Sequence, residues 1–303
     1  MKCLWEKRYW TDKTSVAIVG NCQARPLAQA IESIVPNIKI SGVAIVHLLC
    51  DAQEAEYVPI FESADLILAQ LVTNNYPCNF VRNVDLREKY GDRVRIWPNL
   101  YYSGYNPELF YLRGKDRKPL GGPVGDYHNK TFYEAWRAGL SVDEAVSRHL
   151  NYDFNEKTYV HIPEISLDEL RKRESGTDVR IVDWIKEHMW RQRLFFTFNH
   201  PAQALIRELA CRLVSAAGFD VLPDAMMTQP KREPLGQLGC PVNPWVARKY
   251  GCTFVDPEEY RGREVISNES SNFIMGKHRI YSIHQVVEEY FRVYDLNGKT
   301  ASS

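Results

Sequence analysis

The segment from residue 15 to residue 35 constrains the fold most, because it changes from a buried-strand pattern to a helical pattern within a few residues. Residues 15–20 read Ser-Val-Ala-Ile-Val-Gly, an apolar run typical of a strand that is buried on both faces. Residues 25–35 follow with a helical spacing of apolar side chains. The positions that share this helical face are Leu27, Ile31, Ile34 and Val35. A strand, a tight turn and a helix are therefore predicted here.

The alternation of strand and helix continues along the chain. Further strands are predicted at residues 38–47, 64–72 and 93–98, and helices at residues 49–62 and 79–90. Strands that alternate with helices form parallel sheets with helices on both faces. The predicted fold class is therefore α/β, with a three-layer core around a flavodoxin-like parallel sheet.

The middle of the chain, residues 101–192, loses strand character, and we interpret it as a helical insertion into the core. Two capping-box patterns, Ser141 with Glu144 and Ser166 with Glu169, each predict the start of a helix in this region. The insertion is therefore expected to be built mainly from helices.

Strand character returns at residues 193–200, which we place in the same parallel sheet, and a helix is predicted to follow. The core is then expected to comprise residues of about 14–100 and 193–220. Residues 221–303 are predicted to form a loop-rich C-terminal extension with a terminal helix around 282–294. The whole chain is interpreted as one α/β domain.

Composition and charge exclude several classes of protein. The chain has 38 Lys and Arg residues and 38 Asp and Glu residues, so no global basic field favours nucleic acid. It has no signal-peptide pattern and no run of about 18 apolar residues, so we expect a cytoplasmic protein without a membrane span. The seven cysteines include no Cys-x-x-Cys pair, and no metal-binding motif is found. We therefore expect reduced thiols and no metal.

The turn Gly20-Asn21-Cys22-Gln23 places a nucleophilic side chain where a predicted strand ends. Ligands of open α/β sheets bind outside the carboxyl ends of the strands. A cysteine at a helix N-terminus has a pKa of roughly 3.5–7.5 instead of about 8.5, because the N-terminal N–H groups stabilise the thiolate. The same N–H groups are candidates to hold an oxyanion. The alternative is that Cys22 is a small buried thiol that only fills space.

His200 ends the last predicted strand and precedes a predicted helix. In the predicted fold this position lies at the carboxyl edge of the sheet, where Cys22 is also expected. A cysteine nucleophile needs a base within hydrogen-bond reach, and His is the usual choice. Asn199 is a candidate to orient the imidazole. Alternatively, Asn199 and His200 only form a helix-capping turn without chemistry.

Further polar residues follow predicted strands and are candidates for the same edge. Gln70, Asn74 and Asn75 follow the third strand and can donate hydrogen bonds to an oxyanion or a ligand carbonyl. His47 ends the second strand and either lines this edge or is a buried core histidine.

Several motifs together resemble those of the WcbI family of capsular polysaccharide biosynthesis enzymes. The best two are Gly20-Asn21-Cys22-Gln23 and Asn199-His200-Pro201. The others are Gln70 with Asn74-Asn75, Ser103-Gly104-Tyr105-Asn106-Pro107, and Asp126-Tyr127-His128. The resemblance covers roughly residues 15–220.

The resemblance implies an acetyltransferase that binds coenzyme A and moves an acetyl group from acetyl-CoA to a sugar hydroxyl. It also implies a core similar to that of SGNH/GDSL hydrolases, in which a Gly-Asp-Ser turn carries the nucleophile and a late Asp-x-x-His carries the base. Here Cys22 replaces the serine, and His200 matches the base. Position 197 is Thr197 rather than Asp, so a Cys–His dyad is expected instead of a triad.

The resemblance, together with the positions of residues at the predicted sheet edge and helix start, suggests which residues contact the ligands. Those expected to bind coenzyme A or the sugar are Gly20, Asn21, Arg25, His47, Asn74, Asn75, Ser103, Tyr105 and Asn199. Arg25 is the first candidate for the phosphates, because it lies in the first turn of a predicted helix. The basic loop 113–118 is the second candidate.

Two mechanisms remain open for the acetyltransferase. In one, Cys22 takes the acetyl group, with His200 as base and Gln23 and Gln70 as further catalytic residues. In the other, His200 activates the sugar hydroxyl for direct attack on acetyl-CoA, and Cys22 only positions the thioester. The alternative functions are a Cys-dependent thioesterase or esterase and a non-catalytic protein that binds coenzyme A and sugar.

Overall fold

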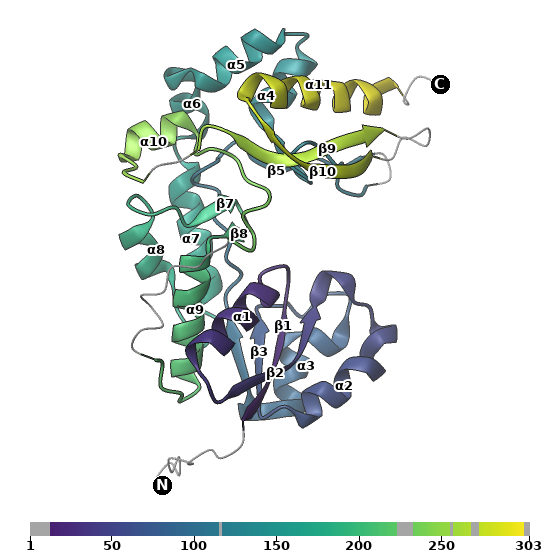
Figure 1. Cartoon of the computed structure of the whole chain (residues 1–303), viewed down its shortest axis with the longest axis vertical. Helices are drawn as coiled ribbons and strands as arrows, with labels where there is room; N and C mark the ends of the chain where they lie inside the picture. The colour runs from purple at the N-terminus through teal and green to yellow at the C-terminus, as the bar shows by residue number, and fades with distance from the viewer. Residues whose placement is uncertain (1–12, 115–116, 223–232, 255–256, 268–272, 300–303) are drawn as a thin grey trace. The chain divides into compact units, whose positions relative to one another are not determined.

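The computed structural model describes residues 13–114, 117–222, 233–254, 257–267 and 273–299. The chain divides into two compact units, whose elements are labelled in Figure 1. The first unit comprises Met1–Asn99, Lys172–Ile181 and Ala204–Lys231, and the second comprises Leu100–Arg171, Val182–Gln203 and Arg232–Ser303. The first ten residues, on which the prediction of no signal peptide depends, lie outside the described residues.

The first unit is built around a four-stranded parallel sheet in the order β2-β1-β3-β4. Its strands are β1 (Thr14–Gly20), β2 (Ile38–Ile45), β3 (Leu66–Gln70) and β4 (Val94–Trp97). This is the order of a doubly wound, flavodoxin-like sheet, and the predicted α/β class is confirmed. Ligands of such sheets bind at the carboxyl ends of β1 and β3, where the direction of winding reverses.

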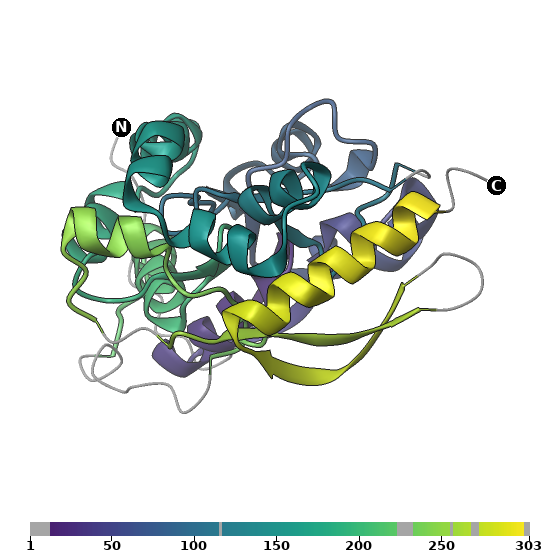
Figure 2. The ribbon, with the colours of Figure 1, turned by 90° about the horizontal axis from the view of Figure 1, so that it is seen from above.

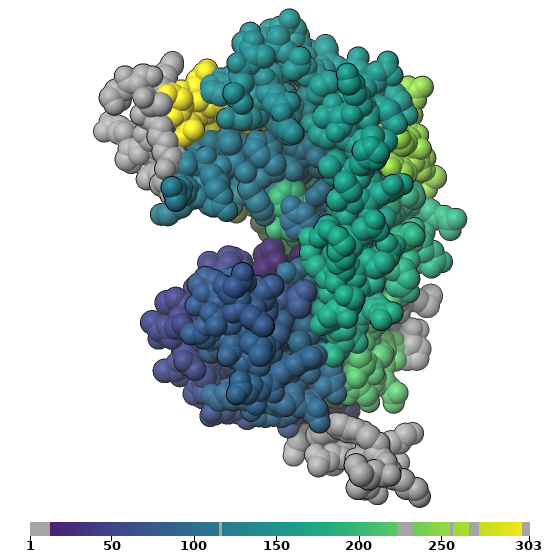
Figure 3. Space-filling view, turned by 180° about the vertical axis from the view of Figure 1, so that it is seen from behind, coloured from purple at the N-terminus to yellow at the C-terminus, as the bar shows by residue number. Residues whose placement is uncertain are grey.

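Helices cover both faces of this sheet. They are α1 (Ala24–Ile34), α2 (Glu54–Ser63), α3 (Asn83–Tyr90) and α9 (Gln203–Ala216), with short 3-10 helices at Val46–Leu48, Asp51–Gln53, Asn79–Val81 and Gly91–Arg93. Figure 1 shows α1 on one side of the sheet and α2 and α3 on the other. On the second side, Ala17 and Val19 of β1 belong to the same buried cluster as Phe61 of α2 and Leu86 of α3. Figure 3 shows the purple-to-blue residues of this unit gathered into one body.

Gly20 closes β1 in a very crowded position. A Cβ atom at Gly20 would lie 2.8 Å from Cζ2 of Trp97 and 3.3 Å from Cβ of Gln70. The first of these distances is too short for any real contact between carbon atoms, so only glycine fits without a shift of the indole. The register pairs Val19 with Ala69, which brings the ends of β1 and β3 side by side. The chain that leaves β1 therefore starts directly beside Gln70.

The second unit is mainly helical. Its helices are α4 (Lys130–Arg137), α5 (Val142–Leu150), α6 (Tyr152–Tyr159), α8 (Val182–His188), α10 (Pro244–Tyr250) and α11 (Ile283–Lys299), and α7 (Ile162–Glu174) continues from this unit into the first. The predicted capping box is confirmed at α5, where Ser141 and Glu144 bond each other's backbone N–H groups. The prediction for Ser166 is wrong, because Ser166 lies inside α7 and its hydroxyl accepts the N–H of Ser103 at 2.8 Å.

Short antiparallel strands complete the second unit. They are β5 (Leu109–Tyr111) with β6 (Tyr127–Asn129), β7 (Phe195–Thr197) with β8 (His200–Pro201), and β9 (Tyr260–Ser267) with β10 (Phe273–Tyr281). Figure 2 shows α11, in yellow, running along the β9–β10 pair. The predicted terminal helix is thus present, but the extension also contains a strand pair that its sequence did not indicate.

The prediction that residues 193–200 belong to the parallel sheet is wrong. β7 has three residues, and the chain reverses directly after it, so that Thr197 pairs with His200 in an antiparallel ladder. The position of His200 at the edge of the sheet, as argued from the sequence, therefore no longer holds. Within the part of the chain that the structure describes, no helix is both long and apolar enough to span a membrane.

Candidate functional site

Cys22 lies in the turn that joins β1 to α1. Three hydrogen bonds among Asn21, Gln23 and Gln70 hold this turn. The N–H of Asn21 donates to Oε1 of Gln70 at 2.9 Å, and the N–H of Gln23 donates to Oδ1 of Asn21 at 2.9 Å. Nε2 of Gln70 donates to Oε1 of Gln23 at 3.1 Å. Both glutamines are buried, so these bonds form away from bulk water, where losing one partner destabilises most. The backbone around the thiol is therefore held in one conformation.

These hydrogen bonds change the roles expected for the turn. The N–H groups of Asn21 and Gln23 were predicted to be available for an oxyanion, but both already have acceptors within the protein. Gln70 likewise uses its amide to hold the turn. Gln23 and Gln70 thus position Cys22 in this structure, and their predicted catalytic roles stay predictions.

The network extends from Gln70 to a residue that the sequence did not single out. The carbonyl of Gln70 accepts a hydrogen bond from Nδ2 of Asn83 at 2.9 Å, and the N–H of Val72 donates to Oδ1 of Asn83 at 2.7 Å. Asn83 is buried at the start of α3. In the sequence it is only a polar amide inside the helix predicted at residues 79–90, a pattern too common to indicate a site.

Burial raises the pKa of the Cys22 thiol, and the hydrogen bond from its own backbone N–H lowers it by less. The low pKa predicted from the helix N-terminus is therefore wrong. Desolvation disfavours the charged thiolate and here outweighs the stabilisation by the N–H groups. At neutral pH the thiol is protonated, and any nucleophilic reaction of Cys22 needs a base.

The raised pKa predicts slow alkylation of Cys22 near neutral pH. Because only the thiolate reacts, the rate constant with iodoacetamide should rise about tenfold for each pH unit between pH 7 and pH 9. Peptide mass spectrometry after timed alkylation measures this rate at Cys22, with the exposed Cys50 as an internal comparison. A rate that is already constant below pH 7 would contradict the raised pKa.

His200 lies in β8 of the second unit and contacts Tyr127. The hydroxyl of Tyr127 donates to Oδ1 of Asn199 at 2.5 Å and lies 3.1 Å from Nε2 of His200. A phenol has one hydrogen, so the Tyr127 oxygen can only accept from His200, which assigns the ring proton to Nε2. Nδ1 then carries the lone pair, and this nitrogen is buried without a hydrogen-bond partner among the described residues. Tyr290 fixes this arrangement by donating its hydroxyl to the Tyr127 carbonyl at 2.6 Å.

Burial lowers the pKa of His200 to about 4, and the Leu238 backbone raises it by a smaller amount. The imidazole is therefore neutral at physiological pH, which is the form that acts as a general base. Tyr127 was quoted in a motif but not expected in the site. It lies 73 residues before His200 in the chain, and no local pattern indicates their contact.

The other residues predicted in the first unit lie at the carboxyl end of the sheet. Arg25 is exposed in the first turn of α1, and Asn74 and Asn75 are exposed in the loop after β3. His47 is exposed in the 3-10 helix that follows β2, so it is not a buried core histidine. All four side chains are accessible to a ligand.

The residues predicted in the loop 101–107 have structural roles in the second unit. Tyr105 is buried, and its hydroxyl contacts the carbonyl oxygens of Met189 and Gln192. The N–H of Ser103 is bound by Ser166. Tyr105 is thus part of the core, and its prediction as a ligand-binding residue is not supported by its burial.

Backbone contacts join the described residues at the two ends of the basic loop 113–118. Arg113 and Pro119 form an isolated bridge, and the N–H of Gly114 donates to the Lys118 carbonyl at 2.9 Å. Lys115 and Asp116 lie outside the described residues. The loop's role as the second candidate for phosphate binding stays a prediction.

A family model described as polysaccharide biosynthesis enzyme WcbI matches residues 15–222, which is more than half of the chain. The chain belongs to the WcbI family. The predicted family is thus confirmed, and the protein is a member of a family of polysaccharide biosynthesis enzymes. No curated protein matches the chain significantly.

A solved structure of WcbI is similar to this chain, with a TM-score of 0.70 and 19% sequence identity. The match covers 95% of this chain and 91% of that chain. That protein is described as a novel polysaccharide biosynthesis enzyme, in its native form without a disulfide bond between coenzyme A and one of its cysteines. At this identity the likeness shows a shared fold, and it extends over nearly all of both chains.

Proposed function

We propose that this WcbI-family protein transfers an acetyl group from acetyl-CoA to a sugar hydroxyl during synthesis of a capsular or surface polysaccharide. The observation that carries the proposal is the fixed position of Cys22 in a turn at the carboxyl ends of β1 and β3. In sheets of this order, that is where ligands bind. The solved WcbI structure, whose description names coenzyme A and a cysteine, supports a coenzyme A ligand.

In the proposed first step, Sγ of Cys22 attacks the thioester carbonyl of acetyl-CoA while His200 takes the thiol proton. The bond between the carbonyl carbon and the coenzyme A sulfur breaks, and the departing sulfur receives the proton from His200. One thioester replaces another, so the step is close to isoenergetic. The neutral imidazole of His200 is the form that this step requires.

In the second step, His200 takes the proton of the sugar hydroxyl, and the sugar oxygen attacks the acetyl group on Cys22. The bond between the acetyl carbon and Sγ breaks, and the thiolate recovers the proton. Thioester becomes oxygen ester, which is downhill.

A second route has no covalent intermediate, and a protonated Cys22 thiol is compatible with it. In that route His200 deprotonates the sugar hydroxyl, the oxygen attacks acetyl-CoA directly, and Cys22 only positions the thioester. Both routes give the same products. A stable acetyl-enzyme, trapped by rapid acid quenching and located by mass spectrometry, distinguishes them.

Binding of coenzyme A is tested by thermal unfolding in the presence of coenzyme A and a panel of nucleotide sugars. A ligand of the native state at about 100 times its Kd stabilises it by about 2.7 kcal/mol. We expect this shift with coenzyme A, and a smaller one in Arg25→Gln, because Arg25 is exposed at the α1 N-terminus. Lys39→Gln, an exposed cation near the opposite end of β2, is the matched control.

Transfer itself is tested by product analysis with acetyl-CoA, with and without an acceptor sugar. An O-acetylated sugar supports the proposal. Free acetate formed equally in both reactions would instead indicate a thioesterase. Binding of coenzyme A without release of either product would indicate a non-catalytic binding protein.

A further inference from the structure

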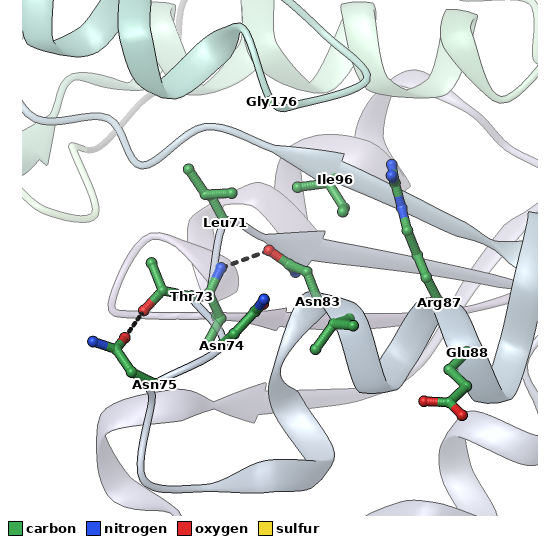
Figure 4. Close-up of a pocket in the computed structure, with 11 residues that line it drawn as sticks. Leu71, Thr73, Asn74, Asn75, Asn83, Arg87, Glu88, Ile96 and Gly176 are labelled. Carbon is green, nitrogen blue, oxygen red and sulfur yellow. Dashed lines mark hydrogen bonds between the residues drawn. The ribbon is translucent and has the colours of Figure 1, made fainter.

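A surface pocket of about 990 Å³ lies in the first unit, at the carboxyl end of β3. Its polar residues are Thr73, Asn74, Asn75, Asn83, Arg87 and Glu88. Figure 4 shows that three of these follow β3 in one loop and that the others belong to α3. The volume is at the upper end of the range for small-molecule sites. The pocket is therefore large enough for more than one monosaccharide unit.

The chemistry of the lining suits a ligand with many hydroxyl groups. Amide side chains such as Asn74 and Asn75 both donate and accept hydrogen bonds, as a sugar hydroxyl does. The hydroxyl of Thr73 bonds Oδ1 of Asn75 at 2.6 Å, which orients that amide across the loop. Apolar side chains, among them Leu71 and the 46% exposed Val84, offer contact to the C–H faces of a sugar ring.

The charges of the pocket argue against phosphate groups. Arg87 is the cation in the lining, and its guanidinium bonds both carboxylate oxygens of Asp178 at 2.9 Å. Its charge is thus largely compensated, while Glu88 adds a negative charge. An anionic ligand would meet the carboxylate of Glu88, and the charge of Arg87 is already paired with Asp178. A neutral polyhydroxylated ligand meets no such penalty.

The pocket is coupled to the Cys22 turn through Asn83. The amide of Asn83 bonds the Gln70 carbonyl and the Val72 N–H, and Asn83 itself lines the pocket. The side chain of Gln70 in turn accepts the N–H of Asn21. Two consecutive hydrogen-bonded residues therefore connect the lining of the pocket to the backbone beside the thiol.

We propose that this pocket binds the carbohydrate acceptor, and that the phosphates of coenzyme A bind elsewhere. The inference rests on the proposed function, because the acceptor is defined by that reaction. It assigns Asn74, Asn75 and Glu88 as the residues that bond sugar hydroxyls. The neutral sugar is thus assigned to this pocket, and the anionic phosphates of coenzyme A are assigned to Arg25.

Saturation-transfer NMR with a panel of methyl glycosides and N-acetylhexosamines tests binding without any turnover. We expect at least one sugar to bind the wild-type chain and to lose about three- to tenfold in affinity in Asn75→Ala and in Glu88→Ala. Both positions are exposed, so the variants should fold. Glu56→Ala, an exposed carboxylate in the first turn of α2, is the matched control and should bind as the wild type does.

Coenzyme A binding by the same variants separates this inference from the proposed function. If the variants lose sugar binding but still bind coenzyme A, the result supports the pocket as the sugar site. This holds even if the wild-type protein transfers no acetyl group. In that case only the proposed function fails. With active enzyme, the variants should raise KM for the acceptor and leave kcat unchanged. The inference is overturned if no sugar binds, or if the variants weaken coenzyme A instead of sugar.

Discussion

Replacing Cys22 with alanine is expected to lower kcat for acetyl transfer by ~10³-fold or more, while coenzyme A still binds. The reason is that the covalent route has no other nucleophile, and loss of a nucleophile removes most of the catalytic gain. The turn should survive the change, because its hydrogen bonds join Asn21, Gln23 and Gln70 and not the thiol. Coenzyme A release from acetyl-CoA, followed in the presence of acceptor, measures the effect.

Cys211→Ala is the matched control for this variant. Cys211 is also partly buried, and burial raises the pKa of its thiol as it does for Cys22, but it lies within α9. It should retain wild-type turnover. A Cys22→Ala variant that keeps full activity removes Cys22 as the nucleophile, and a loss of tenfold or less favours direct transfer, in which the thiol only positions the thioester.

The core of the first unit could be predicted because its strands are short runs of apolar residues separated by helical patterns. The strand predicted at 64–72 is observed as Leu66–Gln70, and the strand at 93–98 as Val94–Trp97. Such runs indicate strands that are buried on both faces, and the pattern can be recognised locally in the sequence. The fold class and the positions of the strands follow from this pattern.

Strand pairing could not be predicted in the same way, because a partner strand is a non-local property. Residues 194–198 are mostly apolar, as in a central strand, but Thr197 pairs with His200 across a reversal of two residues. The β9–β10 pair was missed for the opposite reason. Most side chains of β10 are exposed or half-buried, so Phe273–Tyr281 shows no apolar pattern.

The site was only partly predictable for related reasons. The turn around Cys22 follows from local sequence, but the bond from Asn21 to Gln70 spans 49 positions. A sequence also indicates a helix N-terminus and not how deeply a thiol is buried, so the direction of the Cys22 pKa shift was predicted wrongly. Neither the Tyr127 contact nor the role of Asn83 has a local signature.

Replacing His200 with asparagine is expected to lower kcat by ~10²–10⁴-fold, the usual contribution of a general base. In the wild type, the pKa of His200 is about 4, below its ordinary value, because the imidazole is buried. The neutral base therefore persists above about pH 5, and activity should fall as the pH drops through 4 and the ring becomes protonated. The exposed His278→Gln on β10 is the matched control and should leave the profile unchanged.

The loss of activity at low pH that comes from protonation of His200 must be distinguished from loss that comes from unfolding. Burial also lowers the pKa values of His128 and His149 to about 4, so the unfolded chain binds more protons than the folded one between about pH 6.5 and pH 4. Stability therefore falls as the pH falls through this range. Circular dichroism at each pH identifies the range in which the fold persists, and only rates from that range count.

Tyr127→Phe tests whether the base is held in one tautomer. The change removes the oxygen that accepts the Nε2 proton of His200 and the bond to Asn199, but it keeps the ring packing at 5.4 Å. We expect kcat to fall about tenfold, because the imidazole then divides between two tautomers and orientations, with KM for acetyl-CoA unchanged. A purely structural role would lower thermal stability but leave the pH profile and kcat of the folded enzyme as in the wild type. A variant with unchanged kcat would therefore exclude Tyr127 as the residue that positions His200.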